Sequence, residues 1–176
     1  MTDTHGPPAF ILPEALLSRG LSLRRETDAD LPFLMQLFAA SRADELALVP
    51  WTDDEKRGFL IQQFGAQRSH YYAYFQDASF DVIELDGKPI GRLYIDERWT
   101  RVHIIDIAII PGNRAGGIGT ALLTEIQHYA RARGKGVDIF VERMNPAKSL
   151  YDRLGFKVVR EEDVYLEMDW APEGVS

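Results

Sequence analysis

The stretch PGNRAGGIGTALL, residues 111–123, holds four glycines and one proline within nine residues and then continues as a good helix former. Glycine costs conformational entropy, and it is used where the backbone needs unusual dihedral angles or where a ligand approaches the main chain closely. The preceding run, VHIIDIAII (102–110), is apolar nearly throughout and predicts a central strand covered on both faces. A glycine-rich turn between such a strand and a helix directs free N–H groups and the positive end of the helix dipole to one point. We therefore expect an anion site here, with phosphate as its ligand.

Apolar periodicity and capping patterns on both sides of this stretch predict the other elements. The Asp-Gly pair at 86–87 indicates a tight turn between two of the strands. Together the elements predict an α/β fold in the order β-α-α-β-β-β-α-β-α-β-β. Strands are expected at 21–25, 80–85, 89–95, 102–110, 137–142, 156–160 and 164–170. Helices are expected from Leu31 to about Ala40, from Thr52 past Phe64, from Ile118 to about Arg133, and at 146–154.

The composition is that of a globular chain with a single core. The chain has 176 residues, of which 45% are hydrophobic, and a net charge of −7. This acidity opposes nonspecific binding to nucleic acid or to an anionic membrane and favours a cationic small molecule. The chain has no cysteine, which excludes a disulfide, a thiolate nucleophile and a thiolate metal site. No metal is expected.

The ends of the chain predict its organisation. Residues 1–20 have no basic leader, and their apolar runs are short and interrupted by Pro13, unlike a signal peptide or a membrane span. We expect an N-terminal arm at 1–20, a single domain at 21–172, a tail at 173–176 and a cytoplasmic location.

Several interpretations of the glycine-rich stretch compete. A nucleotide P-loop would need a lysine after the last glycine, but Gly119 is followed by Thr120. A dinucleotide-binding fold would explain Asp138 as a ribose ligand, yet that fold places its glycines after the first strand, and here several strands precede them. A turn without any ligand is the third interpretation.

Two motifs favour another interpretation. Ile109, Pro111 and the segment Arg114–Gly119, followed by NPAKSLYDRLGF (145–156), closely resemble the GCN5-related N-acetyltransferase (GNAT) superfamily. The first motif is similar to its pyrophosphate loop and the second to its Asn…Ala-x-x-Leu-Tyr-x-x-x-Gly-Phe segment. The resemblance covers roughly residues 21–170, although the motifs themselves occupy only 102–156. It implies a twisted mixed sheet of about seven strands with helices on both faces.

The resemblance also implies acetyl-CoA as the cosubstrate. The strand before the loop is expected to splay from its neighbour, so that Ile107 and Ile109 offer backbone groups to pantetheine. Asn145 is a further candidate for binding coenzyme A, although the cap of a helix is an equally good explanation for it. The residues expected to hold the pyrophosphate are Arg114, Ala115, Gly116, Gly117, Ile118, Gly119 and Thr120.

Tyr151 matches a tyrosine that, in many family members, donates a proton to the departing thiolate. The alternative is that its ring only packs in the core. A phenol with a pKa of about 10 is a weaker acid than a thiol of about 8.5, so full proton transfer in water would be uphill by roughly 2 kcal/mol. The expected role is therefore a hydrogen bond that strengthens as charge develops.

The acceptor amine needs a base or a desolvating pocket. His103 stands where some relatives place a base, although exposure to solvent is an alternative explanation for it. Asp106 interrupts an apolar run, so it must reach a cleft or be buried with a partner. The resemblance implies that Asp106 contacts a cationic acceptor or acts as a base through water. Glu45 and Trp51 lie in the segment that forms one side of the acceptor pocket in this family. The alternative is that they belong to a solvated helix end.

These residues predict an N-acetyltransferase that moves an acetyl group from acetyl-CoA to a primary amine of a small molecule, by direct attack in a ternary complex. The alternative is a catalytically weak acyl-CoA-binding sensor or partner module of the same fold. The sequence identifies neither the amine nor the oligomeric state, and a homodimer is possible.

Overall fold

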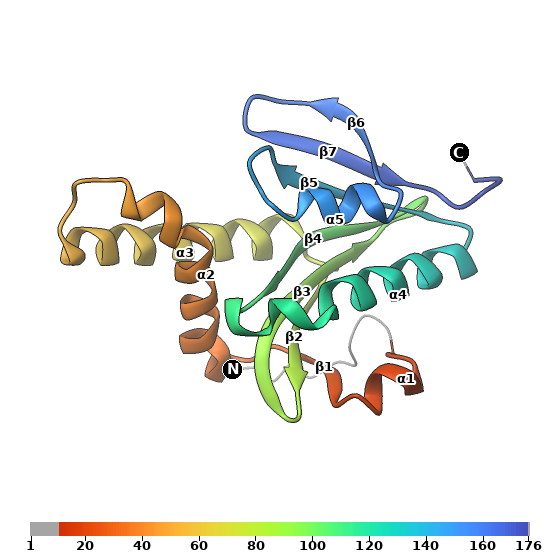
Figure 1. Cartoon of the computed structure of the whole chain (residues 1–176), viewed down its shortest axis with the longest axis horizontal. Coiled ribbons are helices and arrows are strands. Elements are labelled where there is room, and N and C mark those ends of the chain that lie inside the picture. Colours follow the sequence, from red (N-terminus) through yellow and green to blue (C-terminus); the bar gives the residue numbers. More distant parts are fainter. Residues whose placement is uncertain (1–10, 176) are drawn as a thin grey trace.

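The computed structural model describes residues 11–175, and these form one mixed β-sheet with helices on both faces (Figure 1). Residues 1–10 of the expected arm and Ser176 of the expected tail lie outside the described residues. The strands are β1 (Leu21–Arg25), β2 (Ser79–Leu85), β3 (Lys88–Glu97), β4 (Arg101–Ile109), β5 (Gly136–Glu142), β6 (Lys157–Glu161) and β7 (Tyr165–Trp170).

The sheet has the strand order β1-β2-β3-β4-β5-β7-β6. All neighbouring strands are antiparallel except β4 and β5, which are parallel and are joined by a crossover through a helix. The α-helices are α1 (Glu14–Leu17), α2 (Leu31–Ala47), α3 (Asp53–Tyr74), α4 (Ile118–Ala132) and α5 (Lys148–Arg153), and the 3₁₀ helices are η1 (Asp28–Asp30) and η2 (Pro111–Gly116). The predicted fold class and the order of its elements are confirmed.

The two faces of the sheet are covered by different helices. The main core holds Leu16 of α1, Leu122 and Ile126 of α4 and Tyr151 of α5, so these three helices share one face. On the other face, α2 and α3 pack against each other through Phe38 and Phe64. Only the end of α3 reaches the sheet, and the connection between α2 and α3 lies at the end of the molecule away from the strands (Figure 1).

Two local expectations need correction. The first long helix ends at Ala47 rather than near Ala40, because most residues after Ala40 are good helix formers and Leu46 extends the buried face, with no proline between Ala40 and Pro50. The short helix α1 was not expected. Among residues 11–175, no helix is long and apolar enough to span a membrane.

Candidate active site

The glycine-rich stretch forms the turn between β4 and α4. It consists of the 3₁₀ helix η2 and then Gly117, whose φ of 71° is left-handed and which occupies the N-cap of α4. No side chain caps this helix, and the backbone N–H of Ala121 donates to the Gly117 carbonyl at its start. Gly116 and Gly117 are exposed. The free N–H groups and the dipole of a helix of this length make the turn suitable for an anion.

Two arginines stabilise the turn. Nε of Arg114 donates to the carbonyl of Ile109 at 2.8 Å and so connects the turn to the end of β4. Nη2 of Arg19, which follows α1, donates to the carbonyl of Gly116 at 3.2 Å. Ile118 points into the core, so only its backbone can face an anion, whereas Thr120 is exposed. Arg19 was missed, since nothing in its sequence neighbourhood relates it to residue 116.

β4 and β5 separate beside this turn. Their parallel pairing runs over Arg101–Ile104 and Gly136–Ile139, and no register pair follows it among the described residues. β4 nevertheless continues to Ile109 and β5 to Glu142. The splay that the resemblance implies is therefore present, and the backbone of Ile107 lies in it. The carbonyl of Ile109 is already occupied by Arg114.

Tyr151 combines a packed ring with a free hydroxyl. Its side chain is 4% exposed, and its ring meets the edge of Phe156 at a centroid distance of 5.7 Å. Among residues 11–175 its hydroxyl has no hydrogen-bond partner. Burial, and then the negative charge of Asp106, raise the pKa of Tyr151 above its usual value of about 10. The phenol therefore stays protonated near Asp106 and can donate a hydrogen bond.

Asp106 is both partly exposed and paired. Its Oδ2 accepts from Nε of Arg92 at 2.5 Å, while its side chain remains 25% exposed. Arg92 is buried, donates from Nη2 to Gln67 of α3 at 2.9 Å, and lies over the ring of Tyr94. The sequence contained a signal for this pair, because Arg92 is the single charge in the apolar run 89–95 and Asp106 the single charge in the apolar run 102–110.

His103 is buried, so the alternative explanation of a solvent-exposed histidine is wrong. Its side chain is 4% exposed, and its Nδ1 lies 2.9 Å from Oδ1 of Asp138 on β5. The rings of Phe75 and Phe140 pack against it. His103 lies in the paired part of β4, about 10 Å along the strand from Asp106. The structure does not bring its imidazole into the splay.

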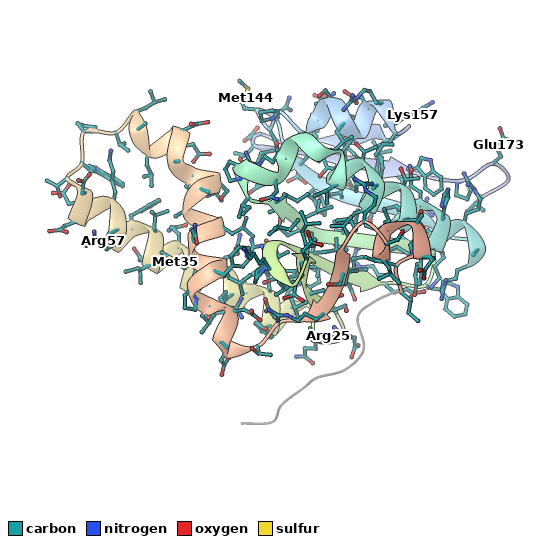
Figure 2. All side chains as sticks on the ribbon, turned by 60° about the horizontal axis from the view of Figure 1, so that its bottom comes forward. Arg25, Met35, Arg57, Met144, Lys157 and Glu173 are labelled. Carbon is teal, nitrogen blue, oxygen red and sulfur yellow. The ribbon has the colours of Figure 1, made fainter. Side chains whose placement is uncertain are left out.

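The other candidates are divided between the site and the periphery. Oδ1 of Asn145 accepts from the backbone N–H of Ala147 at 2.9 Å, which is the capping role. Glu45 is exposed and lies 3.6 Å from Arg42, which in turn reaches Glu142 of β5 at 3.1 Å. Trp51 packs on Phe59 at the start of α3. Most of this 22-residue helix, a distance of about 30 Å, separates Trp51 from the sheet. The side chains around Arg57 in this region stand away from the sheet (Figure 2), so Trp51 is not brought to Asp106.

Tyr71 of α3 was not expected at the site. Its ring meets the edge of Tyr94 at 5.8 Å, and Tyr94 lies directly opposite Asp106 in the pairing of β3 with β4. Burial, and then the charge of Asp106, raise the pKa of Tyr71 above its usual range. Its hydroxyl forms no hydrogen bond with any of residues 11–175. A tyrosine within a helix carries no sequence signal for such a position.

Comparison with known proteins agrees with this geometry. The profile of the family described as Acetyltransferase (GNAT) family matches residues 37–156, so the chain belongs to the GNAT acetyltransferase family. An uncharacterised N-acetyltransferase of Methanocaldococcus jannaschii is 33% identical over 131 residues, covering 60% of this chain and 58% of that protein. A mycothiol acetyltransferase of Thermomonospora curvata is 27% identical over 154 residues, covering 82% of this chain and 47% of that protein. The chain thus spans only about half the length of these curated relatives.

Solved structures share the fold. The PaiA N-acetyltransferase of Thermoplasma acidophilum, in complex with coenzyme A, superposes with a TM-score of 0.65 at 16% identity. The match covers 86% of this chain and 99% of that one. At this identity the likeness concerns the fold alone.

Proposed function

We propose that the protein is an acetyl-CoA-dependent N-acetyltransferase that transfers the acetyl group to a primary amine of a small molecule, by direct attack in a ternary complex. The observation that carries this proposal is the free hydroxyl of Tyr151, held in a protonated state near Asp106 in the splayed part of β4. Family membership and the coenzyme A in the PaiA structure support the choice of donor. When bound, acetyl-CoA supplies an acyl thioester whose leaving group is a thiolate.

The turn before α4 has room for the donor's phosphates. A Cβ added at Gly117 would meet no atom within 4 Å, and one added at Gly116 would meet only the side chain of Ile118, at 3.9 Å. A phosphate can therefore approach the backbone N–H groups at the start of α4. The unpaired edge of β4 leads from this turn toward Asp106 and provides backbone groups along the way.

Asp106 and Tyr151 have different tasks in this proposal. An alkyl ammonium with a pKa of about 10.4 loses its proton at pH 7 at a cost of about 4.6 kcal/mol. Oδ1 of Asp106 is free to accept a hydrogen bond from the ammonium and to pass its proton to water, because only Oδ2 is engaged by Arg92. The amine nitrogen then attacks the acyl carbon and loses its second proton to water through Oδ1 of Asp106. The carbon–sulfur bond breaks, and the thiolate leaves with a hydrogen bond from the Tyr151 hydroxyl to the sulfur. His103 is too buried for the amine to reach it.

The reaction itself is tested by the release of free thiol from acetyl-CoA in the presence of a panel of primary amines. We expect release with at least one small amine and recovery of the N-acetyl product. If coenzyme A binds in a titration but no amine is acetylated, the protein is instead an acyl-CoA-binding sensor.

A valine at Gly116 tests the phosphate site. The φ of Gly116 is not positive and its surroundings are open, so Gly116→Val should leave the melting temperature unchanged. The branched side chain would keep a phosphate from the backbone, and we expect KM for acetyl-CoA to rise on the order of tenfold, or about 1.4 kcal/mol. The matched control is Gly112→Val, in the same turn and equally open. Equal KM values for both variants would refute phosphate binding at this turn.

A further inference from the structure

Three carboxylates lie near the splay on the sheet face that carries α2 and α3, and each of them is paired with an arginine. We call the sheet face that carries α2 and α3 the acceptor face. On it, Asp106 pairs with Arg92 at 2.5 Å, and Glu142 pairs with Arg42 at 3.1 Å. Glu45 also lies beside Arg42, at 3.6 Å. Despite the net charge of −7, Arg92 neutralises Asp106, and Arg42 neutralises one of the two glutamates. The remaining negative charge lies toward Glu45, whose side chain is 63% exposed, so solvent screens it from a second or third ammonium of a polyamine.

Aromatic rings cover the same face without interruption. Phe140 of β5 packs on His103 at a centroid distance of 5.7 Å, and His103 packs on Phe75 at 5.9 Å. Phe75 then contacts Tyr71 at 6.2 Å. Phe140 is the first residue of β5 beyond its pairing with β4, and it is 43% exposed. We call Phe140, His103, Phe75 and Tyr71 the aromatic belt; it begins where the strands separate.

Two polar atoms beside the belt are available to a ligand. Oδ1 of Asp106 and the hydroxyl of Tyr71 each have no hydrogen-bond partner among residues 11–175. Asp106 is partly exposed, and Tyr71 packs on Tyr94, which faces Asp106 across the strands. One carboxylate oxygen and one hydroxyl suit a single ammonium group, and the belt suits an apolar body attached to it.

We infer that the acceptor is a primary monoamine with an aromatic body, and that Tyr71 determines this preference. The inference rests on the proposed function and narrows its acceptor. The ammonium lies between Asp106 and Tyr71, while the ring of the acceptor stacks on the accessible rings of the aromatic belt, those of Phe140, Phe75 and Tyr71, and not on the buried His103. A polyamine is disfavoured because its additional charges would be desolvated against rings and paired ions.

Three amines test this preference: 2-phenylethylamine as the aromatic monoamine, propylamine as an aliphatic monoamine and spermidine as a polyamine. We expect kcat/KM for 2-phenylethylamine to exceed both others at least tenfold. A higher value for spermidine would overturn this inference while leaving the proposed function intact. Absence of transfer to every amine would overturn both.

Removal of Tyr71 tests its role in the preference. Tyr71→Ala should raise KM for 2-phenylethylamine about tenfold and change KM for propylamine much less. The matched control is Tyr74→Ala, on the same helix but 75% exposed, which should leave both KM values unchanged. Equal losses for the two amines in Tyr71→Ala would overturn the assignment. Should that variant fold poorly, Tyr71→Phe retains the ring. This variant should raise both KM values by the same factor and so keep their ratio. If both KM values stayed unchanged, the role of the hydroxyl would be overturned.

The charge argument predicts a gain of activity. Arg42→Gln leaves Glu142 and Glu45 without their cation, so kcat/KM for spermidine should rise at least fivefold relative to that for 2-phenylethylamine. The control is Arg57→Gln, since Arg57 pairs with Asp54 near the start of α3 and lies away from the sheet (Figure 2). An unchanged ratio in Arg42→Gln, with the melting temperature of the wild type, would show that paired carboxylates do not exclude polyamines and would overturn the inference.

Discussion

Replacement of Tyr151 by phenylalanine is expected to lower kcat on the order of 100-fold, the usual effect of losing a positioned proton donor. The ring, which packs on Phe156, is retained, and the deleted hydroxyl has no partner among the described residues. Stability and KM for acetyl-CoA should therefore stay close to those of the wild type. The measurement is kcat at saturating acetyl-CoA together with a urea denaturation curve.

The pH dependence of kcat provides a second readout of the same residue. Because burial and Asp106 raise the pKa of Tyr151, its phenol keeps its proton to higher pH than an exposed tyrosine does. Loss of that proton would remove the hydrogen bond to sulfur. We therefore expect no fall in the kcat of the wild type between pH 8 and about 10, near the ordinary tyrosine pKa.

A tyrosine with a bonded hydroxyl is the matched control. Tyr72 donates to Oε1 of Glu26 at 2.5 Å and packs on Phe80 of β2, which β3 separates from β4 and the splay. Tyr72→Phe should cost about 1 kcal/mol of stability and leave kcat unchanged. If Tyr151→Phe instead behaved like this control, with lower stability and full kcat, Tyr151 would be a core residue and the thiolate would leave unprotonated or through water.

The elements of the fold were predictable because they depend on local patterns. Alternation of apolar residues identified the strands, and the glycines of 112–119 identified the turn before α4 regardless of what surrounds them. The end of α2 was misjudged because a helix without a breaker continues as long as tertiary contacts, here those of Leu46, stabilise it. Local signals mark the start of a helix better than its end.

The composition of the site depended on pairings that no local pattern contains. His103 and Asp106 are three residues apart, so simple alternation would place them on opposite faces of the sheet. A bulge shifts the register, since Tyr94 pairs with Asp106 but Ile95 pairs with Ile104, and Ile105 has no partner on β3. The extra residue returns both side chains to the acceptor face. The burial of His103 against Asp138 and the position of Tyr71 both follow from this long-range geometry.

Substitution of Gly91 by alanine is expected to be strongly destabilising, because β3 and β4 approach each other closely there. Gly91 lies opposite Ile109, and a Cβ at this position would come within 2.2 Å of the carbonyl oxygen of Ala108 and 3.2 Å of the Ile109 Cα. Both are backbone atoms, so no side-chain rotation can relieve the overlap. Past Ile104, β4 has lost its pairing with β5, and β3 is its remaining neighbour in the sheet.

Relief therefore requires β3 and β4 to move apart at the end of β4 that supports the glycine-rich turn. We expect Gly91→Ala to lower the free energy of unfolding by about 3 kcal/mol, at the upper end of the usual cost of overpacking. The matched control is Gly58→Ala on α3, where an added Cβ meets nothing within 4 Å. Alanine there should raise stability by about 0.5–1 kcal/mol, because glycine is a poor helix former. Urea denaturation of both variants measures the two effects, and a Gly91→Ala protein as stable as the wild type would show that β4 can shift there without cost.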